Sequence, residues 1–246
     1  MASACDESLR LFLNRLRAHW DLSDADCRAI LDLPTEQVFV RARAEVVVPG
    51  TKLFHAVLVC EGLVGRYGQN PDGKRLFTSL YLPGEMADLH SLVQPVGNWA
   101  IEALTDSILC QIPHTAMKRM IAHHPSVGMA LWQDDANDWA TTAERAGVLA
   151  TRGALARLAH LLCELFARFR AAGLVEDHRF ELPLNQSQLG EMLGMSSVHI
   201  SRMLSELRRR NAVQMEGRTL TIISSDTLGA LAGFEPSYLR LRPEYA

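Results

Sequence analysis

The chain has 246 residues, 48% of them hydrophobic and 22% charged, which is enough for one large or two modest domains with real cores. No apolar run reaches the roughly 18 residues of a membrane span, and no secretory signal is visible, so we expect a cytoplasmic protein without a membrane partner. The formal net charge of −3 is not typical of a nucleic-acid-binding protein, and five scattered cysteines favour a reducing compartment over a disulfide framework.

The first 35 residues are predicted to form a helical lead-in. A helical pattern begins at residue 8 and continues to about residue 33. Ser23 is a suitable N-cap for a short helix that continues through Ile30-Leu31, and Pro34 stops that helix.

Residues 36–124 are predicted to form a β-domain. Short β-like runs alternate there with turn dipeptides such as Pro49-Gly50, Glu61-Gly62 and Pro83-Gly84. Many short strands at regular spacing are typical of a sandwich or a jelly-roll barrel. The expected strands are residues 38–40, 45–48, 53–60, 63–67, 76–82 and 101–112.

From Thr115 to about Ala172 the pattern is helical, and residues 125–151 carry a heptad repeat. A period of about 3.5 residues is that of a coiled-coil seam. A helix that packs on its own domain would give a similar pattern, but two tryptophans among alanines favour large side chains that fit small ones across a two-fold axis. The predicted dimer seam consists of Met129, Trp132, Ala136, Trp139, Ala143, Ala146 and Ala150.

The stretch from Asn185 to Arg210 predicts two short helices joined by a glycine turn. Asn185 with Gln188 fits a capping box, and Gly194 suits the left-handed residue that ends such a helix. Ser196 is a suitable N-cap for the second helix. Apolar stripes at helical spacing are expected to point inward, namely Leu189, Met192 and Leu193 in the first helix and Ile200, Met203, Leu204 and Leu207 in the second.

The outward face of the second helix carries small residues and one arginine, namely Val198, Ser201, Arg202 and Ser205. Small side chains let a helix backbone enter the major groove of DNA, and arginine pairs bidentately with guanine. A helical hairpin with an ordinary solvated face is the alternative, but capping, turn glycine, inward stripe and outward arginine all agree. The region therefore predicts a DNA-binding helix-turn-helix.

A small β-hairpin is expected directly after this motif. Residues 212–215 and 219–223 alternate enough for two strands, with Gly217 at the turn and Arg218 at the tip, within reach of a phosphate. Such a hairpin is typical of a winged helix-turn-helix. The charge distribution adds weak support, because residues 1–151 have a net charge of −5 and residues 152–246 of +2.

A family resemblance covers almost the whole chain. Residues 182–213, LPLNQSQLGEMLGMSSVHISRMLSELRRRNAV, look like the C-terminal DNA-binding domain of the Crp/Fnr family of bacterial transcription regulators, and the upstream half fits that family's layout. The implied fold is α+β, with an N-terminal cyclic-nucleotide-binding-like β-roll (jelly roll), a long dimerisation helix and a C-terminal winged helix-turn-helix. The implied boundaries are 1–35 for the lead-in, 36–124 for the effector domain, 125–151 for the dimerisation helix, 152–225 for the DNA-binding domain and 226–246 for a C-terminal tail.

The resemblance implies a homodimeric regulator of transcription and not an enzyme. Its partners would be double-stranded DNA, a second copy of the chain and RNA polymerase. Two-fold symmetry implies a near-palindromic site, and the junction at residues 149–153 is a candidate hinge at Gly153. The expected DNA-contacting residues are Gln186, Ser187, Ser196, Ser197, Val198, His199, Ser201, Arg202, Arg209 and Arg218.

The effector of the β-domain is expected to differ from cyclic AMP. Cyclic-nucleotide members of the family have an acid for the ribose and, about ten residues later, an arginine that clamps the phosphate. Here Asp88 would replace the acid, Asn98 replaces the arginine and Trp99 takes the place of a small serine. Burying a phosphate without a cation is costly. A small organic ligand near Asp88, Leu89, His90, Asn98 and Trp99 is one remaining interpretation, and an effector-independent DNA-binding dimer is another.

Other family effectors find little support in the sequence. An iron–sulfur cluster needs about four thiolates, and Cys5, Cys27, Cys60 and Cys110 have no close spacing. Haem would need an axial ligand such as His55 or His90, and a reactive thiol cannot be chosen without knowing burial. The cofactor is therefore unknown, and no metal ligands are predicted.

A cupin-like metal-binding enzyme is the rival from another class. Its His-x-His pair with a following carboxylate is absent, and the neighbouring pair His123-His124 would diverge on a helix. No nucleophile elbow, phosphate loop or zinc spacing occurs either. The sequence therefore predicts no catalytic residue.

Overall fold

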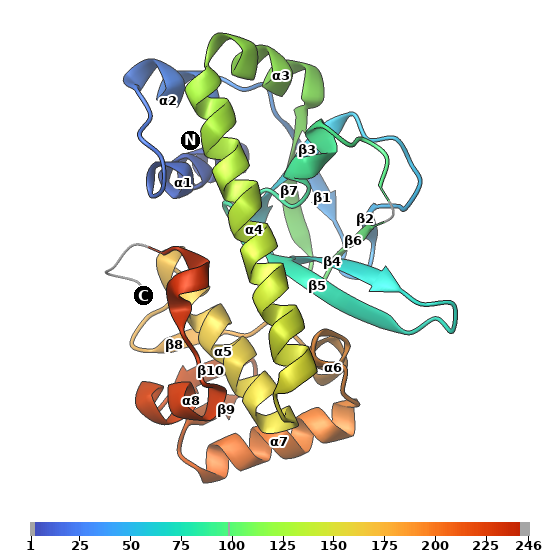
Figure 1. Ribbon diagram of the computed structural model, residues 1–246, viewed down its shortest axis with the longest axis vertical. Helices are drawn as coiled ribbons and strands as arrows, with labels where there is room; N and C mark the ends of the chain where they lie inside the picture. Colours follow the sequence, from blue (N-terminus) through green and yellow to red (C-terminus); the bar gives the residue numbers. More distant parts are fainter. Residues whose placement is uncertain (1–2, 98, 242–246) are drawn as a thin grey trace. The chain divides into compact units, whose positions relative to one another are not determined.

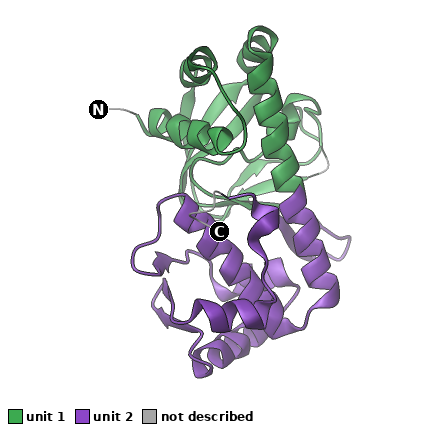
Figure 2. Cartoon of the chain, turned by 60° about the vertical axis from the view of Figure 1, so that its left-hand side comes forward, with its two compact units in different colours: residues 1–68, 79–139 green, residues 69–78, 140–246 purple. Residues whose placement is uncertain are grey.

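The computed structural model describes residues 3–97 and 99–241 and divides into two compact units (Figure 2). The first unit contains the chain up to residue 68 together with Ser79–Trp139, and the second contains Gln69–Thr78 together with the chain from Ala140 onward. The long helix α4 (Pro125–Thr151) contributes to both units (Figure 1).

The first unit begins with two capped helices, α1 (Ala4–Arg17) and α2 (Asp24–Leu31). Ser23 is the N-cap of α2, as predicted, and Asp26 completes a capping box with it. Ser3 caps α1 in the same way, so this helix starts earlier than the apolar pattern indicated. Leu9 and Phe12 of α1 are fully buried in the core cluster that also contains Leu58.

In the described residues of the β-domain, seven strands form two sheets, which confirms the predicted β-sandwich. One sheet has the order β1-β7-β3 and the other β2-β6-β4-β5. Their bounds are β1 (Glu36–Val40), β2 (Glu45–Val47), β3 (His55–Glu61), β4 (Val64–Gln69), β5 (Arg75–Tyr81), β6 (Ala100–Ala103) and β7 (Ser107–Pro113).

The expected single strand over residues 101–112 is wrong, because β6 and β7 belong to different sheets. The chain leaves one sheet and enters the other at residues 104–106. Asp106 fixes this crossing, since its carboxylate accepts a hydrogen bond of 2.8 Å from the backbone N–H of Ala42. A continuous apolar run therefore concealed a corner of the sandwich.

One short helical turn lies within the β-domain, and one short helix connects this domain to α4. The 3₁₀ turn η1 (Leu89–Leu92) follows Asp88, and α3 (His114–His123) follows β7 directly. The helical zone that the sequence predicts from Thr115 to about Ala172 is three helices, α3, α4 and α5 (Ala154–Ala171). The chain breaks at His124 before Pro125 starts α4, and again at residues 152–153.

The second unit is built from helices and a three-stranded sheet of order β8-β10-β9. Two strands were predicted, and β8 adds a third that pairs with β10 through Phe180 and Leu220. The bounds are α5 (Ala154–Ala171), β8 (Arg179–Glu181), α6 (Gln186–Leu193), α7 (Ser197–Arg209), β9 (Val213–Glu216), β10 (Thr219–Ile222), α8 (Ser225–Ala232) and η2 (Pro236–Leu239).

The predicted C-terminal tail from residue 226 is wrong in its first part, which is the helix α8. Ser224 caps α8 and Gly233 ends it in the left-handed conformation, with φ of 55°. Leu228 is fully buried and α8 packs on α5. The segment SDTLGALA is only eight residues long and contains Gly229, so its apolar pattern was too short to reveal the helix.

The junction at residues 149–153 lies inside the second unit. The guanidinium of Arg152 donates to the carbonyl oxygens of Ala232 and Gly233, at the end of α8. Gly153 is the N-cap of α5 with an extended backbone, φ −72° and ψ 164°. These contacts hold the junction to its own unit and argue against a hinge at Gly153. No helix in the described part of the chain is long and apolar enough to cross a membrane.

Candidate nucleic-acid interface

The turn between α6 and α7 has the local structure that the sequence predicts. The side chain of Asn185 accepts hydrogen bonds from the backbone N–H groups of Ser187 and Gln188, and the Gln188 side chain accepts one from the N–H of Asn185. Gly194 ends α6 in the left-handed conformation, with φ of 64°. Ser196 then caps α7 by accepting from the N–H of His199 at 3.2 Å. These interactions confirm a helix-turn-helix with two capped helices.

Gly190 is a residue of this turn that sequence reasoning missed. A Cβ on Gly190 would collide with the carbonyl oxygen of Met195, and the N–H of Met195 donates to the carbonyl of Gly190 at 3.0 Å. A larger residue would therefore push α6 away from the turn. A glycine in the middle of an amphipathic helix was the available signal.

The inward face of α7 is also confirmed, with Ile200, Leu204 and Leu207 fully buried. Met203 is only half-buried. On the opposite face Val198 is 69% exposed and Arg202 is exposed. A valine side chain that stands in solvent beside an exposed arginine has no role in the core, so this face is available to a ligand.

The predicted DNA-contacting residues of the second unit are all either exposed or half-buried. His199 and Ser201 are half-buried. The exposed ones are Gln186, Ser187, Ser196, Ser197, Val198, Arg202, Arg209 and Arg218.

Glu206 organises the arginines at the end of α7, and sequence reasoning missed it. Its carboxylate accepts two hydrogen bonds from Arg209, at 2.9 and 2.7 Å, and one from Arg210 at 2.7 Å. Hydrogen bonds from Arg209 and Arg210 lower the pKa of Glu206. The sequence feature that could have revealed this role is the spacing of Glu206 from the arginines, at i, i+3 and i, i+4. Arg209 is therefore partly neutralised, although its side chain remains 73% exposed.

The wing is a hairpin with Gly217 in the left-handed conformation at its turn, φ 61°. Thr219 pairs with Glu216 across the turn, and Arg218 between them is exposed. The hairpin thus presents one arginine at its tip.

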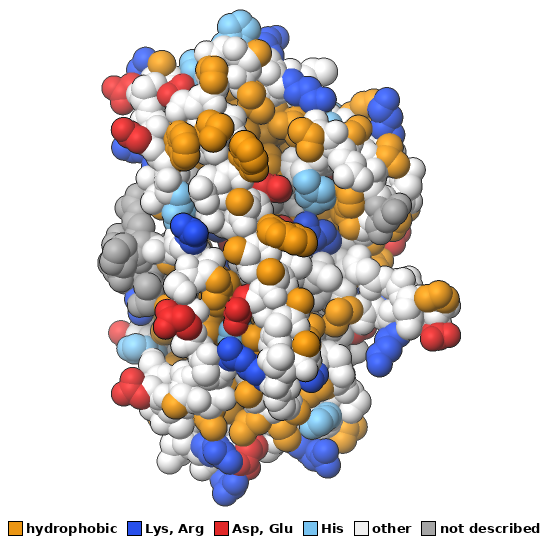
Figure 3. Space-filling view, in the orientation of Figure 1, with side chains coloured by type: hydrophobic (Ala, Val, Ile, Leu, Met, Phe, Trp, Pro, Cys, Tyr) orange, Lys and Arg blue, Asp and Glu red, His pale blue; other side chains and the backbone are white. Residues whose placement is uncertain are grey.

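The dimer seam predicted on α4 is exposed along its whole length. Trp132 and Trp139 are 69% and 70% exposed and Met129 is 42% exposed, while the four alanines of the seam are exposed too. Figure 3 shows hydrophobic side chains along the course of α4 on this face. The other side of the helix is buried through Val127, Leu131 and Val148. The heptad positions are therefore not those that pack within the chain.

Comparison with known proteins identifies both halves. Residues 37–124 match the cyclic nucleotide-binding domain and residues 156–231 the Crp-like helix-turn-helix domain. The transcriptional activator protein FnrA of Stutzerimonas stutzeri is 25% identical over 71% of both chains, and the fumarate and nitrate reduction regulatory protein of Vibrio cholerae is 23% identical over 77% of this chain and 75% of its own. The structure of FixK2 from Bradyrhizobium japonicum superposes with a TM-score of 0.76 at 22% identity, covering 82% of this chain and all of that one.

The chain belongs to the Crp/Fnr family of transcription regulators. It is thus a DNA-binding regulator of the Crp/Fnr type, and the relatives it matches are regulators and not enzymes.

The expected effector residues of this Crp/Fnr regulator do not share one environment. Asp88 is fully buried, and its carboxylate accepts a hydrogen bond of 2.7 Å from the backbone N–H of Val57. Burial raises the pKa of Asp88 to about 7. Leu89 belongs to the core cluster under α1. Asp88 and Leu89 therefore support the fold of the β-domain and do not line an open cavity.

The other three expected effector residues are His90, Trp99 and Asn98. The rings of His90 and Trp99 meet edge to face with centroids 4.2 Å apart, and burial lowers the pKa of His90 to about 4. Asn98 lies outside the described residues. A neutral His90 packed against Trp99 supplies no cation for a phosphate.

Arg66 of β4 is a cation of the sandwich that already has partners within the first unit. Its guanidinium lies 3.1 Å from the carboxylate of Asp138 and donates to Ser79 at 2.8 Å. The hydroxyl of Tyr81 donates to the same Asp138 carboxylate at 3.0 Å. Arg66 therefore holds β4 to the acid on α4, and an incoming anion would compete with that acid.

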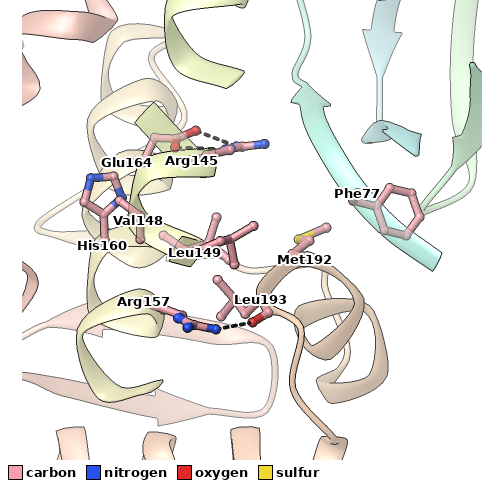
Figure 4. Close-up of a pocket in the computed structure, with 10 residues that line it drawn as sticks. Phe77, Arg145, Val148, Leu149, Arg157, His160, Glu164, Met192 and Leu193 are labelled. Carbon is pink, nitrogen blue, oxygen red and sulfur yellow. Dashed lines mark hydrogen bonds and ion pairs between the residues drawn. The ribbon is translucent and has the colours of Figure 1, made fainter. Parts of the chain in front are cut away.

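A small cavity lies in the second unit among α4, α5 and α6 (Figure 4). Its volume is about 20 Å³, which is room for about one water molecule. Arg157 on its rim points to the carbonyl of Leu193 at 3.5 Å. The cavity is too small for an organic effector.

Three cysteines that are far apart in sequence meet in the first unit. The sulfur atoms of Cys5, Cys60 and Cys110 lie within 4.8 Å of one another and all three residues are buried, whereas Cys27 is not part of this group. Sequence spacing could not show this, because α1, β3 and β7 bring the three residues together only in the folded chain.

These cysteines do not suit the iron–sulfur cluster that the family suggests. Such a cluster takes about four thiolates, and the described group has three. Ligand sulfurs bound to different irons of a cluster also stand farther apart than the sulfurs of this group. The described surroundings of the three sulfurs are a buried cluster of mainly apolar side chains.

Proposed function

We propose that this Crp/Fnr regulator acts as a symmetric homodimer on a near-palindromic DNA site and responds to a signal other than cyclic AMP. The observation that carries the proposal is the pair of exposed surfaces, the heptad seam of α4 and the outward face of α7. RNA polymerase is the expected protein partner at a promoter.

The exposed seam supports the homodimer. Two tryptophans at about 70% exposure on one helix form an apolar stripe that a monomer would leave in water. The stripe alternates large and small residues, so a second copy of α4 can place each tryptophan against alanines. A two-fold axis makes this surface complementary to itself.

A two-fold dimer fixes the symmetry of the DNA target. Two copies of α7 related by that axis would enter successive major grooves roughly 34 Å apart. The preferred site would then be an inverted repeat, each half read by one α7. The wing arginine, Arg218, would contact backbone phosphate beside each half-site.

The exposed face of α7 supports a specific pattern of base contacts. Arg202 would pair with a guanine, and Val198 would contact a thymine methyl group, since valine cannot accept a hydrogen bond from cytosine. Ser197 and Ser201 would contact the neighbouring bases. Ser205 contributes less, because its hydroxyl already donates to the carbonyl of Ser201 at 3.0 Å.

The chemistry of the β-domain supports a signal other than cyclic AMP. The clamp position is an asparagine in the sequence, and Arg66 is bound to Asp138. Asp88 would have to bind the ribose, but this residue is fully buried and its carboxylate accepts a hydrogen bond from the backbone N–H of Val57. A cyclic phosphate would therefore enter this domain without a free arginine in the phosphate cassette.

A base-preference profile of the full-length protein tests the assignment of α7. Arg202→Ala should lose the guanine preference at one position of each half-site, at a cost of about 1–3 kcal/mol per half-site. Arg208→Ala is the matched control, since this exposed arginine lies at the end of α7 and should weaken all sequences alike. An unchanged profile for Arg202→Ala would contradict the proposal.

A further inference from the structure

We propose that Cys5, Cys60 and Cys110 form a three-sulfur site for a thiophilic trivalent ion, with arsenite as the probe. The site lies between α1 and the sheet that contains β3 and β7, in the core cluster to which Leu89 also belongs. It does not depend on the proposed dimer or DNA contacts.

The geometry of the site follows from the register of the sheet. Leu58 of β3 lies opposite Cys110 of β7, and Cys60 is two residues further along β3 on the same face. A β-bulge follows Val59 and brings the chain near Cys60 out of regular pairing. Cys5, in the first turn of α1, covers this face, so the three sulfurs converge from three elements to within 4.8 Å.

The number of ligands limits which ions can bind, because each ion has a preferred coordination number. Within the described residues the group contains three sulfurs and no histidine or carboxylate ligand. Structural zinc sites are almost always four-coordinate, so zinc would lack a ligand. Soft, three-coordinate ions such as Cu(I) and As(III) fit three sulfurs.

The two ions differ in the net charge that their three-thiolate complexes would bury. The three cysteines are 2%, 7% and 0% exposed in an apolar core that includes Leu9 and Ile112. Three thiolates around Cu(I) would leave a net charge of minus two, which is costly to bury. Three thiolates around a trivalent ion leave no net charge.

The binding reaction balances without an oxidant or a base. Arsenite enters as neutral As(OH)₃, three As–O bonds break and three As–S bonds form. Each thiol proton leaves with one hydroxyl group as water, so three water molecules are released. Arsenic remains trivalent, the sulfurs are not oxidised, and no charge enters the core.

The ion can reach the site through the first turn of α1, and contacts of α1 connect the site to α4. Cys5 lies in the first turn of α1, and terminal turns of helices open at low free-energy cost. Arg15, further along α1, contacts Asp134 of α4 at 2.6 Å and Glu85 at 2.9 Å. Asp134 lies between Trp132 and Ala136 in the sequence, and its side chain is on the buried side of α4. Binding that fixes α1 on the sheet therefore strengthens the support of the seam, a step that rests on the proposed dimer.

Arsenite titration of the reduced full-length protein tests the site. We expect one arsenic atom per chain after desalting, three sulfur neighbours in arsenic X-ray absorption and a new sulfur-to-arsenic absorption band in the ultraviolet. Cys5→Ser should weaken binding by more than the roughly 10–100-fold that removal of an outer-shell partner costs at metal sites. Cys5 is the variant of choice because it lies at a helix end, and circular dichroism checks its fold. Cys27→Ser and Cys163→Ser are matched controls outside the group and should retain full binding.

Several outcomes would overturn the proposal. These are unchanged binding in Cys5→Ser, equal loss in Cys163→Ser, fewer than three sulfur neighbours, or tighter binding of Zn²⁺ or Cu(I) than of arsenite in parallel titrations. A disulfide within the group in air-handled protein, with no arsenite uptake after reduction, would also overturn it.

Arsenite should lower the dimer dissociation constant of the wild type and leave that of Cys5→Ser unchanged. An unchanged wild-type dimer would overturn the step to α4, and this failure is distinguishable because arsenic stoichiometry is measured without DNA.

Discussion

Arg145 of α4 and Glu164 of α5 form a buried, bidentate ion pair in the second unit. The guanidinium donates to the two carboxylate oxygens at 3.0 and 2.5 Å, and the Glu164 side chain has no exposed surface (Figure 4). Arg168, one turn along α5, donates to the same carboxylate at 3.0 Å. The C-terminal part of α4 is thereby fixed to the DNA-binding unit by charge-assisted hydrogen bonds.

The first prediction concerns the stability of the second unit. Glu164→Ala leaves Arg145 and Arg168 buried without their shared anion. Loss of one partner of a buried pair costs about 3–5 kcal/mol. Urea unfolding monitored by circular dichroism should show this loss, and Glu176→Ala, at an acid outside this network, is the control. A change below about 1 kcal/mol, the value of a surface pair, would contradict the assigned role.

The same pair predicts how acid affects stability. Burial alone would raise the pKa of Glu164, but Arg145 and Arg168 outweigh it and lower the pKa to about 2. A lowered folded-state pKa contributes stability that is present above the unfolded value of 4.5 and is lost as the pH falls towards about 2. Glu164→Gln should flatten the stability curve in this acidic window. An equal slope in both proteins would contradict the prediction.

Asp88 predicts the opposite dependence in the first unit. Burial raises its pKa from 3.8 to about 7, so the folded state holds a proton that the unfolded chain releases. Stability from this group is full below about 3.8 and declines as the pH rises to about 7. Asp88→Asn keeps an acceptor for the N–H of Val57 and cannot ionise. Thermal unfolding between pH 4 and pH 7 should therefore decline less in Asp88→Asn than in the wild type.

Arg218 predicts a non-specific contribution to DNA affinity. As a phosphate contact at the tip of the wing, Arg218→Ala should weaken binding to all sequences alike and reduce the salt slope by about one unit per contact. Fluorescence anisotropy at several salt concentrations measures the slope. A loss confined to certain base sequences would instead place Arg218 among the base-reading residues.

The helix-turn-helix was predictable from sequence because its determinants are local. The capping pair Asn185 and Gln188, the left-handed Gly194 and the cap Ser196 each act within a few residues. The heptad of α4 was visible in the sequence, and the structure shows that its positions are exposed, while the dimer stays a prediction. The β-roll was predicted from the family resemblance, and the residue pattern predicted the positions of its strands only approximately.

The remaining features depend on contacts between distant segments. Cys5, Cys60 and Cys110 meet because a helix covers two paired strands, which no spacing shows. Asp88 resembled a ligand-binding acid in sequence and is a buried partner of Val57. The helix α8 has weak periodicity and is stabilised by packing on α5.

Sedimentation of Trp139→Asp with and without DNA tests the central claim most directly, that the seam of α4 makes the DNA-binding dimer. An unpaired charge in an apolar interface costs several kcal/mol, so the variant should sediment as a monomer and lose most of its affinity for palindromic DNA. Thr151→Asp, which adds the same charge to an exposed position of α4 outside the seam, should remain dimeric and bind DNA. Cyclic AMP in the same runs should change neither mass nor affinity of the wild type. A Trp139→Asp protein that stays dimeric and binds palindromic DNA as tightly as the wild type would contradict the account.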